Sequence, residues 1–279
     1  EILKSKARIK TIIVKELKSI AEKYGQPRKS IIIYDDVARY EEEAIEIPDY
    51  PVNLFFTKEG YFKKITPQSL RMSGEQKLKD GDEIVQELEF TNNCDLLFFT
   101  DKCQVYKAKA DDFAQTKASV LGDYVAAKLG FDEGENAVKM VVTKDYKGML
   151  LFAFENGKAA KVPLESYATK TNRKKLTGAY SDKSPLVGLL YMPEDEEVLF
   201  KASSGNMLLV HTGALALKTT RSTQGVAVLK PKKGHRLFSI ERYKDGTFTN
   251  PKRYRTGSLP ARGALPVNDD SKDEQLSLI

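Results

Sequence analysis

The sequence predicts an all-β protein, a propeller-like array of about five four-stranded blades that follows one N-terminal α-helix. The main observation is a repeated pattern in which a run of strand-forming residues, a tight turn and a second, usually basic strand follow one another. The pattern occurs at 53–64, 96–109, 149–162 and 198–210. Aligned on their turns, Thr57, Thr100, Phe154 and Ala202 stand 43, 54 and 48 residues apart. A period of 40 to 55 residues with a hairpin in each unit is typical of propeller-like folds.

The segments between the hairpins support the same architecture. Each is rich in Gly, Ser, Thr and Lys and leads back to an apolar strand, which we expect at 83–90, 137–142, 186–192 and 236–243. Near the end, Asp245-Gly246 is a strong hairpin turn, with a return strand expected at 247–255. This last hairpin is either a fifth, partial unit or a strand that completes a neighbouring blade.

The first 24 residues predict a helix. Its apolar residues Ile9, Ile13, Leu17, Ile20 and Tyr24 fall on one face. A glycine and a proline that follow are typical of a helix end. We therefore divide the chain into a helical end and connector (1–34), an acidic linker (35–50), the β domain (51–257) and a disordered tail (258–279).

Composition excludes several classes of protein. The chain has 279 residues, of which 41% are hydrophobic, and no apolar run approaches the roughly 20 residues that span a bilayer. Cys94, Cys103, His211 and His235 are too few and too scattered for a metal site, and we expect reduced thiols in a cytoplasmic protein. Because the first residue is Glu and no signal peptide is visible, we expect the chain to be cut from a longer one.

Charge is unevenly distributed along the chain. The net charge is +6, but 198–240 contains seven Lys and Arg and no Asp or Glu. Such segregation makes a local positive field larger than the net charge suggests. A solvated surface with uneven lysine usage is the alternative interpretation.

No catalytic constellation is visible, so we expect no enzymatic activity from this chain itself. The sequence has no nucleophile elbow, phosphate-binding loop or dinucleotide fingerprint. What remains are cations at the blade period, which we expect on an outer rim that binds and bends duplex DNA through its phosphates. The predicted DNA-binding residues are Lys63, Lys64, Arg71, Lys77, Lys79, Lys107, Lys109, Lys117, Lys161, Lys170, Arg173, Lys174, Lys175, Lys218, Arg221, Lys230, Lys232 and Lys233.

Four motifs in order resemble the C-terminal region of the A subunits of bacterial type IIA topoisomerases, DNA gyrase and topoisomerase IV. Residues 57–64 (TKEGYFKK) resemble the family's T-x-x-G-Y-x-K-R, and 97–106 (LFFTDKCQVY) resemble L-x-F-T-x-x-G-x-x-Y, with Cys103 at the glycine. Residues 221–226 (RSTQGV) are similar to R-x-x-x-G-V. Residues 12–30 resemble the end of the helix that leaves the cleavage core, with Ser30 in place of a threonine.

The resemblance implies a β-pinwheel that binds and bends DNA, with no cofactor in this fragment. It implies that ATP and Mg act through other domains of the full enzyme, and that the partners are the catalytic core and the ATPase subunit. The stretch at 70–81, at the position of the gyrase box QRRGGKG, reads LRMSGEQKLKDG. The paired arginines and double glycine are missing, which favours a topoisomerase IV-like role in decatenation and relaxation over gyrase-type wrapping.

Two further hypotheses concern partners. The tail Gln275–Ile279 (QLSLI) resembles a short peptide that binds bacterial sliding clamps, with Ile279 in place of Phe. A protein-interaction propeller is the alternative of another class. It is disfavoured because the chain has no Trp and nothing that resembles the WD dipeptide.

Overall fold

The computed structural model describes residues 5–26, 30, 47–72, 75–169, 174–267 and 270. The chain forms two compact units, Glu1–Glu46 and Ile47–Ile279. In the first unit, helix α1 spans Lys6–Tyr24, and the Ser5 side chain accepts a hydrogen bond from the amide of Arg8. None of its residues is buried. Apart from Ser30, the predicted connector at 28–34 lies outside the described residues, as does most of the predicted linker.

The second unit consists of four small antiparallel sheets. The first sheet has the order β3-β1-β2-β6, with β1 at Pro51–Thr57, β2 at Tyr61–Ile65, β3 at Ile84–Thr91 and β6 at Asp123–Tyr124. The second has the order β10-β5-β4-β7, with β4 at Asp95–Thr100, β5 at Gln104–Lys109, β7 at Ala137–Thr143 and β10 at Lys175–Thr177. Two short helices, α2 (Pro67–Arg71) and α3 (Val125–Leu129), lie in the connections.

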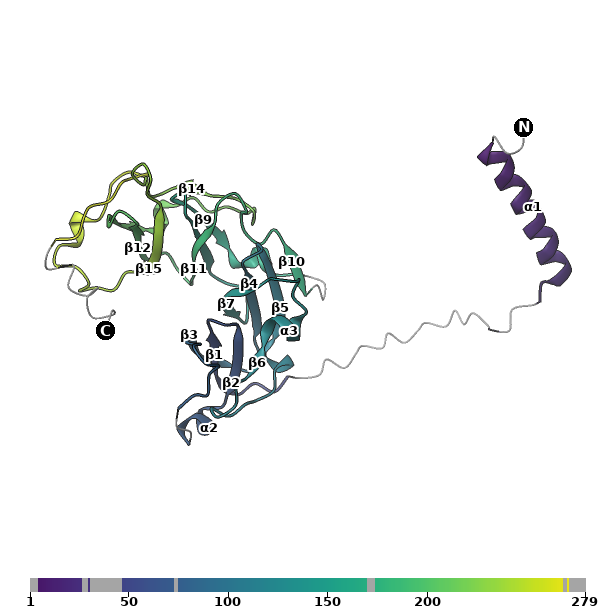
Figure 1. Ribbon diagram of the computed structural model, residues 1–279, viewed down its shortest axis with the longest axis horizontal. Coiled ribbons are helices and arrows are strands. Elements are labelled where there is room, and N and C mark those ends of the chain that lie inside the picture. Colours follow the sequence, from purple (N-terminus) through teal and green to yellow (C-terminus); the bar gives the residue numbers. More distant parts are fainter. Residues whose placement is uncertain are drawn as a thin grey trace. The chain divides into compact units, whose positions relative to one another are not determined.

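The third sheet has the order β11-β8-β9-β14, with β8 at Met149–Phe154, β9 at Lys158–Pro163, β11 at Leu186–Met192 and β14 at Val226–Ala227. The fourth has three strands in the order β13-β12-β15, with β12 at Glu197–Ala202, β13 at Met207–His211 and β15 at Leu237–Arg242. We call each sheet with its connections a blade. The blades follow one another along an arc, shown from dark blue to yellow in Figure 1.

The blades exchange strands with their predecessors. The segment that follows each hairpin turns back to the previous blade and pairs with its second hairpin strand, so β6 pairs with β2, β10 with β5 and β14 with β9. In Figure 1 these returning strands lie on the convex side of the arc, whereas β7 and β11 lie on the concave side. We call the returning segments 110–124, 164–177, 212–227 and 244–267 the rim segments.

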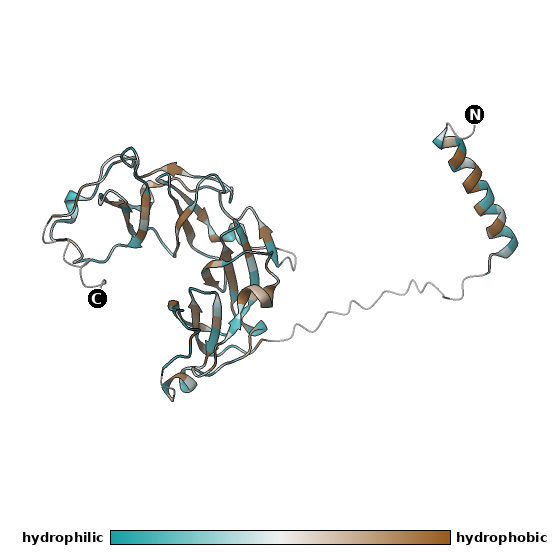
Figure 2. Ribbon diagram, in the orientation of Figure 1, coloured by the Kyte–Doolittle hydropathy of each residue, from teal (hydrophilic) through white to brown (hydrophobic). Residues whose placement is uncertain are grey.

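The position of the core explains why the sequences of the central strands are continuous apolar runs. Each central sheet is buried on both faces, and alternate residues of one strand face opposite neighbours. In β4, Leu96 and Phe98 pack toward the first blade, whereas Leu97 and Phe99 pack toward the third. Hydrophobic residues accordingly gather on the strands in Figure 2, and hydrophilic residues predominate in the connections.

The fold class is confirmed, but the structure contains four blades where the sequence predicted about five. The predicted return strand at 247–255 does not form, because the segment has few apolar residues. Only Phe248 and Tyr254 are buried there, against Leu199 and Leu209 of the fourth blade. The last part of the chain therefore completes the fourth blade, which was the other alternative for this region. The amide of Leu209 donates to the Tyr254 carbonyl, and further along Ala264 pairs with Met207.

The predicted start of the disordered tail at Ser258 is wrong. Residues 258–267 are held by backbone hydrogen bonds, for example from the amide of Ala261 to the Val228 carbonyl and from the amide of Lys230 to the Ala261 carbonyl. No hydrophobic cluster among the described residues joins the first blade to the fourth, and Figure 1 shows the arc open between them.

Candidate nucleic-acid interface

The rim segments place cations along the convex edge of the arc. Three of the four segments first run parallel to a second hairpin strand, in the bridges Lys64–Gln115, Lys161–Leu217 and Leu209–Arg255, and then turn to pair antiparallel with the same strand. In the second segment the described pairing is the antiparallel one between β10 and β5. The edge strand of each sheet is thereby covered. The covering segments bury residues such as Phe113, Leu215 and Tyr254 and expose others, including Lys117. This backbone geometry recurs in three blades, although the residues at the bridge position differ, being Gln115, Leu217 and Arg255.

The eighteen predicted DNA-binding residues divide into four groups by exposure. Nine are exposed, namely Arg71, Lys77, Lys79, Lys109, Lys117, Lys174, Lys230, Lys232 and Lys233. Four are half-buried, namely Lys107, Lys175, Lys218 and Arg221. Three are buried, namely Lys63, Lys64 and Lys161, and Lys170 and Arg173 lie outside the described residues.

The buried lysines on the hairpin strands are a correction to the predicted site. Lys64 is 2% exposed and donates to Asn92 Oδ1 at 2.6 Å, in the connection between β3 and β4, and to the Ala110 carbonyl at 2.7 Å, directly after β5 of the second blade. Lys161 is 5% exposed and donates to Asp195 Oδ1 at 2.9 Å, in the connection between β11 and β12, and to the Thr212 carbonyl at 2.8 Å, directly after β13 of the fourth blade. These ammonium groups join adjacent blades and are unavailable to phosphate.

Lys107 occupies the same repeat position in the second blade. Its Nζ donates to Thr169 Oγ1 at 3.0 Å and lies 4.9 Å from the centroid of the Tyr146 ring. Thr169 follows β9 of the third blade, and Tyr146 lies in the connection between β7 and β8. Burial lowers the pKa of Lys107 and of Lys64. The last blade has Leu209 at this position, packed against Tyr254. Thus the three blades that are followed by another carry lysine here, and the blade that ends the array carries leucine.

Lys63 faces the other way and holds the connection at 66–83. It is 1% exposed and donates to the carbonyls of Lys77 at 2.6 Å and Ala118 at 3.3 Å and to Gln76 Oε1 at 3.2 Å. The amide of Lys77 also donates to the Ala118 carbonyl at 2.8 Å. Gln76 and Lys77, in the described part of the loop at 70–81, are therefore held beside the first rim segment, close in the fold to exposed Lys117.

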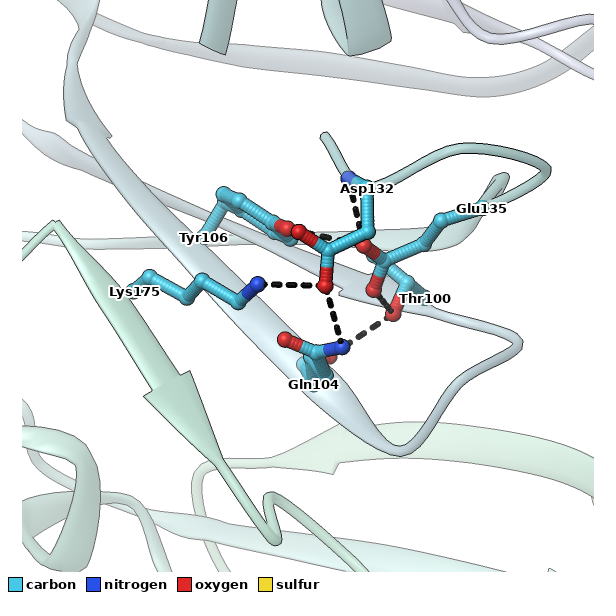
Figure 3. Close-up of polar contacts among 6 residues, drawn as sticks. All are labelled: Thr100, Gln104, Tyr106, Asp132, Glu135 and Lys175. Atoms are coloured by element: carbon cyan, nitrogen blue, oxygen red, sulfur yellow. Dashed lines mark hydrogen bonds and ion pairs between the residues drawn. The ribbon is translucent and has the colours of Figure 1, made fainter. Parts of the chain in front are cut away.

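Lys175 is drawn into a polar cluster at the edge of the second blade (Figure 3). Its Nζ lies 2.6 Å from Asp132 Oδ2 and 5.4 Å from the centroid of the Tyr106 ring. The hydrogen bond from Lys175 lowers the pKa of Asp132 and raises the pKa of Lys175 itself. This cation is partly neutralised by its own chain.

Glu135 lies beneath this pair and anchors the loop that carries Asp132. Its carboxylate is 3% exposed and accepts from the Tyr106 hydroxyl at 2.7 Å, from the amide of Asp132 at 3.1 Å and from the Thr100 hydroxyl. The cluster therefore ties β10, which returns from the third blade, to the body of the second (Figure 3).

The last rim segment contributes cations that sequence reasoning missed. Lys252, Arg253 and Arg262 are exposed there, and Arg255 makes two bonds of 2.7 Å to Glu197. The available signal was the basic run at 252–255, which follows the last blade as Lys218 and Arg221 follow their hairpin. The sequence prediction instead placed this basic run in the return strand of a fifth hairpin, at 247–255.

The described residues offer little for other chemistry. Among them, no group of three or more His, Cys, Asp or Glu could hold a metal ion, and no helix combines the length and apolar character needed to cross a bilayer. Both cysteines are free, and burial raises the pKa of Cys94 to about 12. His211 accepts a hydrogen bond from the amide of Gly213 at 3.2 Å, as a turn histidine does.

The chain is similar to the A subunits of DNA gyrases over most of its length. It is 28% identical to the gyrase A protein of Streptomyces coelicolor over 89% of the chain and 24% identical to that of Metamycoplasma arthritidis over 96%. It spans about a third of the length of these relatives, 30% and 32% respectively. No protein-family model matches the chain.

Solved structures share the fold. The C-terminal domain of DNA topoisomerase IV aligns with a TM-score of 0.67 at 21% identity, over 78% of this chain and 73% of that one. The E. coli ParC C-terminal domain aligns at 0.58 and 15% identity, over 78% and 94%, and the DNA gyrase A C-terminal domain at 0.53 and 18% identity, over 77% and 76%. The predicted resemblance to the C-terminal region of type IIA topoisomerase A subunits is confirmed.

Proposed function

We propose that this chain is the DNA-binding and DNA-bending C-terminal domain of the A protein of a type IIA topoisomerase. The observation that carries the proposal is the outward row of cations on the rim segments, because an arc of positive charge favours a duplex that lies along it and bends. The domain itself carries out no reaction. It guides duplex DNA while other parts of the full enzyme cleave, pass and reseal the strands.

The expected partners follow from this role. They are duplex DNA, the catalytic core that the helical end would continue and the ATPase subunit, with ATP and Mg bound by those other parts. We place the protein in the bacterial cytoplasm, with the nucleoid. The sliding-clamp peptide Gln275–Ile279 lies outside the described residues and stays a prediction.

The favoured activity of the full enzyme is decatenation and relaxation. The loop at 70–81 lacks the paired arginines of the gyrase box, and Lys63 fastens its described part to the first blade through Gln76 and Lys77. The fold similarity to the topoisomerase IV domain agrees with this, whereas the sequence relatives favour the alternative, a gyrase domain that wraps DNA. A topology assay separates the two: gyrase activity would introduce negative supercoils into relaxed plasmid with ATP.

A duplex-binding titration tests the proposal. Each neutralised phosphate steepens log K by about 0.9 per log unit of salt, so one contact from each of the four rim segments predicts a slope of about −4. Four substitutions on these segments, Lys117→Gln, Lys174→Gln, Arg221→Gln and Arg253→Gln, should flatten the slope by about 0.9 for each phosphate contact removed, and the remaining rim cations, such as Lys252 and Arg262, supply the slope that is left. The matched control replaces four exposed lysines outside them, Lys58, Lys102, Lys144 and Lys147, and should keep the slope. Equal losses in both variants would contradict a rim site.

A further inference from the structure

A hydroxyl-rich groove lies where the second and third blades meet at the rim. It has a volume of about 530 Å³ and is formed by Ser166, Thr177 and Gly178 on one side and by 219–222 on the other. Five of its seven lining residues bear a hydroxyl group, one is Gly178 and one is Arg221. None of the seven lining residues is acidic. Glu165, which precedes Ser166 in the chain, does not line the groove.

Arg221 is held in place at the floor of this groove. Its guanidinium lies 5.8 Å from the centroid of the Tyr167 ring, and its Nη1 donates to the Ser166 carbonyl at 3.5 Å. Among the described residues it has no ion-pair partner, unlike Lys175 and Arg255. Because a guanidinium carries five N–H donors, most remain available to an anion in the groove.

The loop that carries Arg221 is fixed by a glycine. Gly225 has φ of +71°, and a Cβ there would lie 1.9 Å from the Ala159 carbonyl oxygen. The amide of Gly225 donates to Thr223 Oγ1 at 3.1 Å, and Val226 pairs with Ala159. The groove wall is therefore set before any ligand binds, which lowers the ordering cost of binding.

The neighbouring junctions do not repeat this set of side chains, although the backbone positions are equivalent. The third residue of the turn after each hairpin is Ser166 here, and it is Asp112 and Ala214 at the other two junctions. The residue in the register position of Thr177 is Tyr124 in the first blade and Ala227 in the third. Among the described residues, Ser or Thr therefore occupies both of these positions only at the central junction.

We propose that this groove seats one phosphodiester group of the bound duplex. Arg221 supplies a charged, directional donor, and the hydroxyls of Thr177, Thr220 and Ser222 supply neutral donors of the kind that commonly contact DNA phosphates. The inference rests on the proposed DNA binding and makes it specific. Most rim cations act by charge alone, whereas this site fixes the position of the duplex at the middle of the arc.

The test uses substitutions that remove hydroxyl groups without changing charge. The groove variant of the full 279-residue chain is Thr220→Val with Ser222→Ala, and the control is Thr256→Val with Ser119→Ala, all on exposed rim positions. With two hydrogen bonds lost, duplex binding should weaken about five- to twenty-fold in the groove variant, with an unchanged salt slope, and stay within about two-fold in the control. Arg221→Gln should in addition flatten the slope by about 1.

The outcomes separate this inference from the proposed function. If the unsubstituted chain fails to bind duplex DNA, the proposed function fails and the groove proposal with it. If the unsubstituted chain binds with a steep salt slope but the groove variant matches it, only the groove proposal is overturned. Equal weakening of groove and control variants would also overturn it. Thermal melts of each variant, with unchanged midpoints, exclude unfolding as the cause.

Discussion

Replacing Lys64 by methionine tests whether the strand lysines join blades or bind DNA. Methionine keeps most of the apolar stem but removes the ammonium group. The buried acceptors Asn92 Oδ1 and the Ala110 carbonyl, now 2.6 and 2.7 Å from Nζ, are then left without this donor. Asn92 is fully buried and also donates to the Pro48 carbonyl and to Asp111, so it cannot turn away easily.

The magnitude follows from the two orphaned acceptors. Each buried acceptor that loses its partner costs about 1–3 kcal/mol, and the relief of not burying a charge offsets part of this. We expect a net loss of about 2–4 kcal/mol in the free energy of unfolding. For a domain of this size that lowers the melting midpoint by about 5–15 °C.

The assay pairs a thermal melt with DNA binding at a temperature where all variants are folded. Lys64→Met should lower the midpoint and leave duplex affinity within about two-fold. Lys117→Met, on the exposed first rim segment, should leave the midpoint nearly unchanged and weaken binding. The reasoning would be refuted if Lys64→Met kept the midpoint and weakened binding as Lys117→Met does.

Two further predictions concern charged pairs. Asp132→Asn should release Lys175 from its carboxylate partner and strengthen duplex binding about two- to five-fold at low salt in an anisotropy titration, and weaker binding would contradict this. The hydrogen bond from Lys161 lowers the pKa of Asp195 in the folded chain, so its stabilising effect is present above pH 3.8 and is lost as the pH falls through the folded-state pKa. Acid melts of Asp195→Asn should therefore show a flatter fall in midpoint than the unsubstituted chain, and parallel curves would count against the pair.

Local pattern predicted the hairpins because each is formed by neighbours in the chain. The turn position illustrates this: Gly60, Gly157 and Gly205 all have positive φ, and Cys103 takes the same conformation at φ 56° despite its side chain. The exchanged strands were not predictable in this way. β6 and β14 have only two residues each, and their partners lie in the preceding blade, so no local period marks them.

The DNA-binding role of the cations named from the sequence stays a prediction, and where the structure places them could be predicted only in part. Cations at the blade period do occur on the rim segments, but Lys64 and Lys161 stand on strands buried on both faces. The hairpin register indicates that these two lysines are buried. Lys64 is paired with Leu54 and Lys161 with Leu151, and each pair faces the next blade. A strand between two sheets has no solvent face, so its lysines must find partners inside the protein.

Chemical footprinting of lysines with and without duplex DNA tests the central claim most directly. An acylating reagent marks each exposed amine, and mass spectrometry measures how far DNA protects it. The account predicts that DNA protects lysines on the rim segments, such as Lys117, Lys174 and Lys252, while Lys64 and Lys161 stay unreactive in both states and Lys102 reacts equally. Protection at the hairpin turns instead of the rim segments would contradict it.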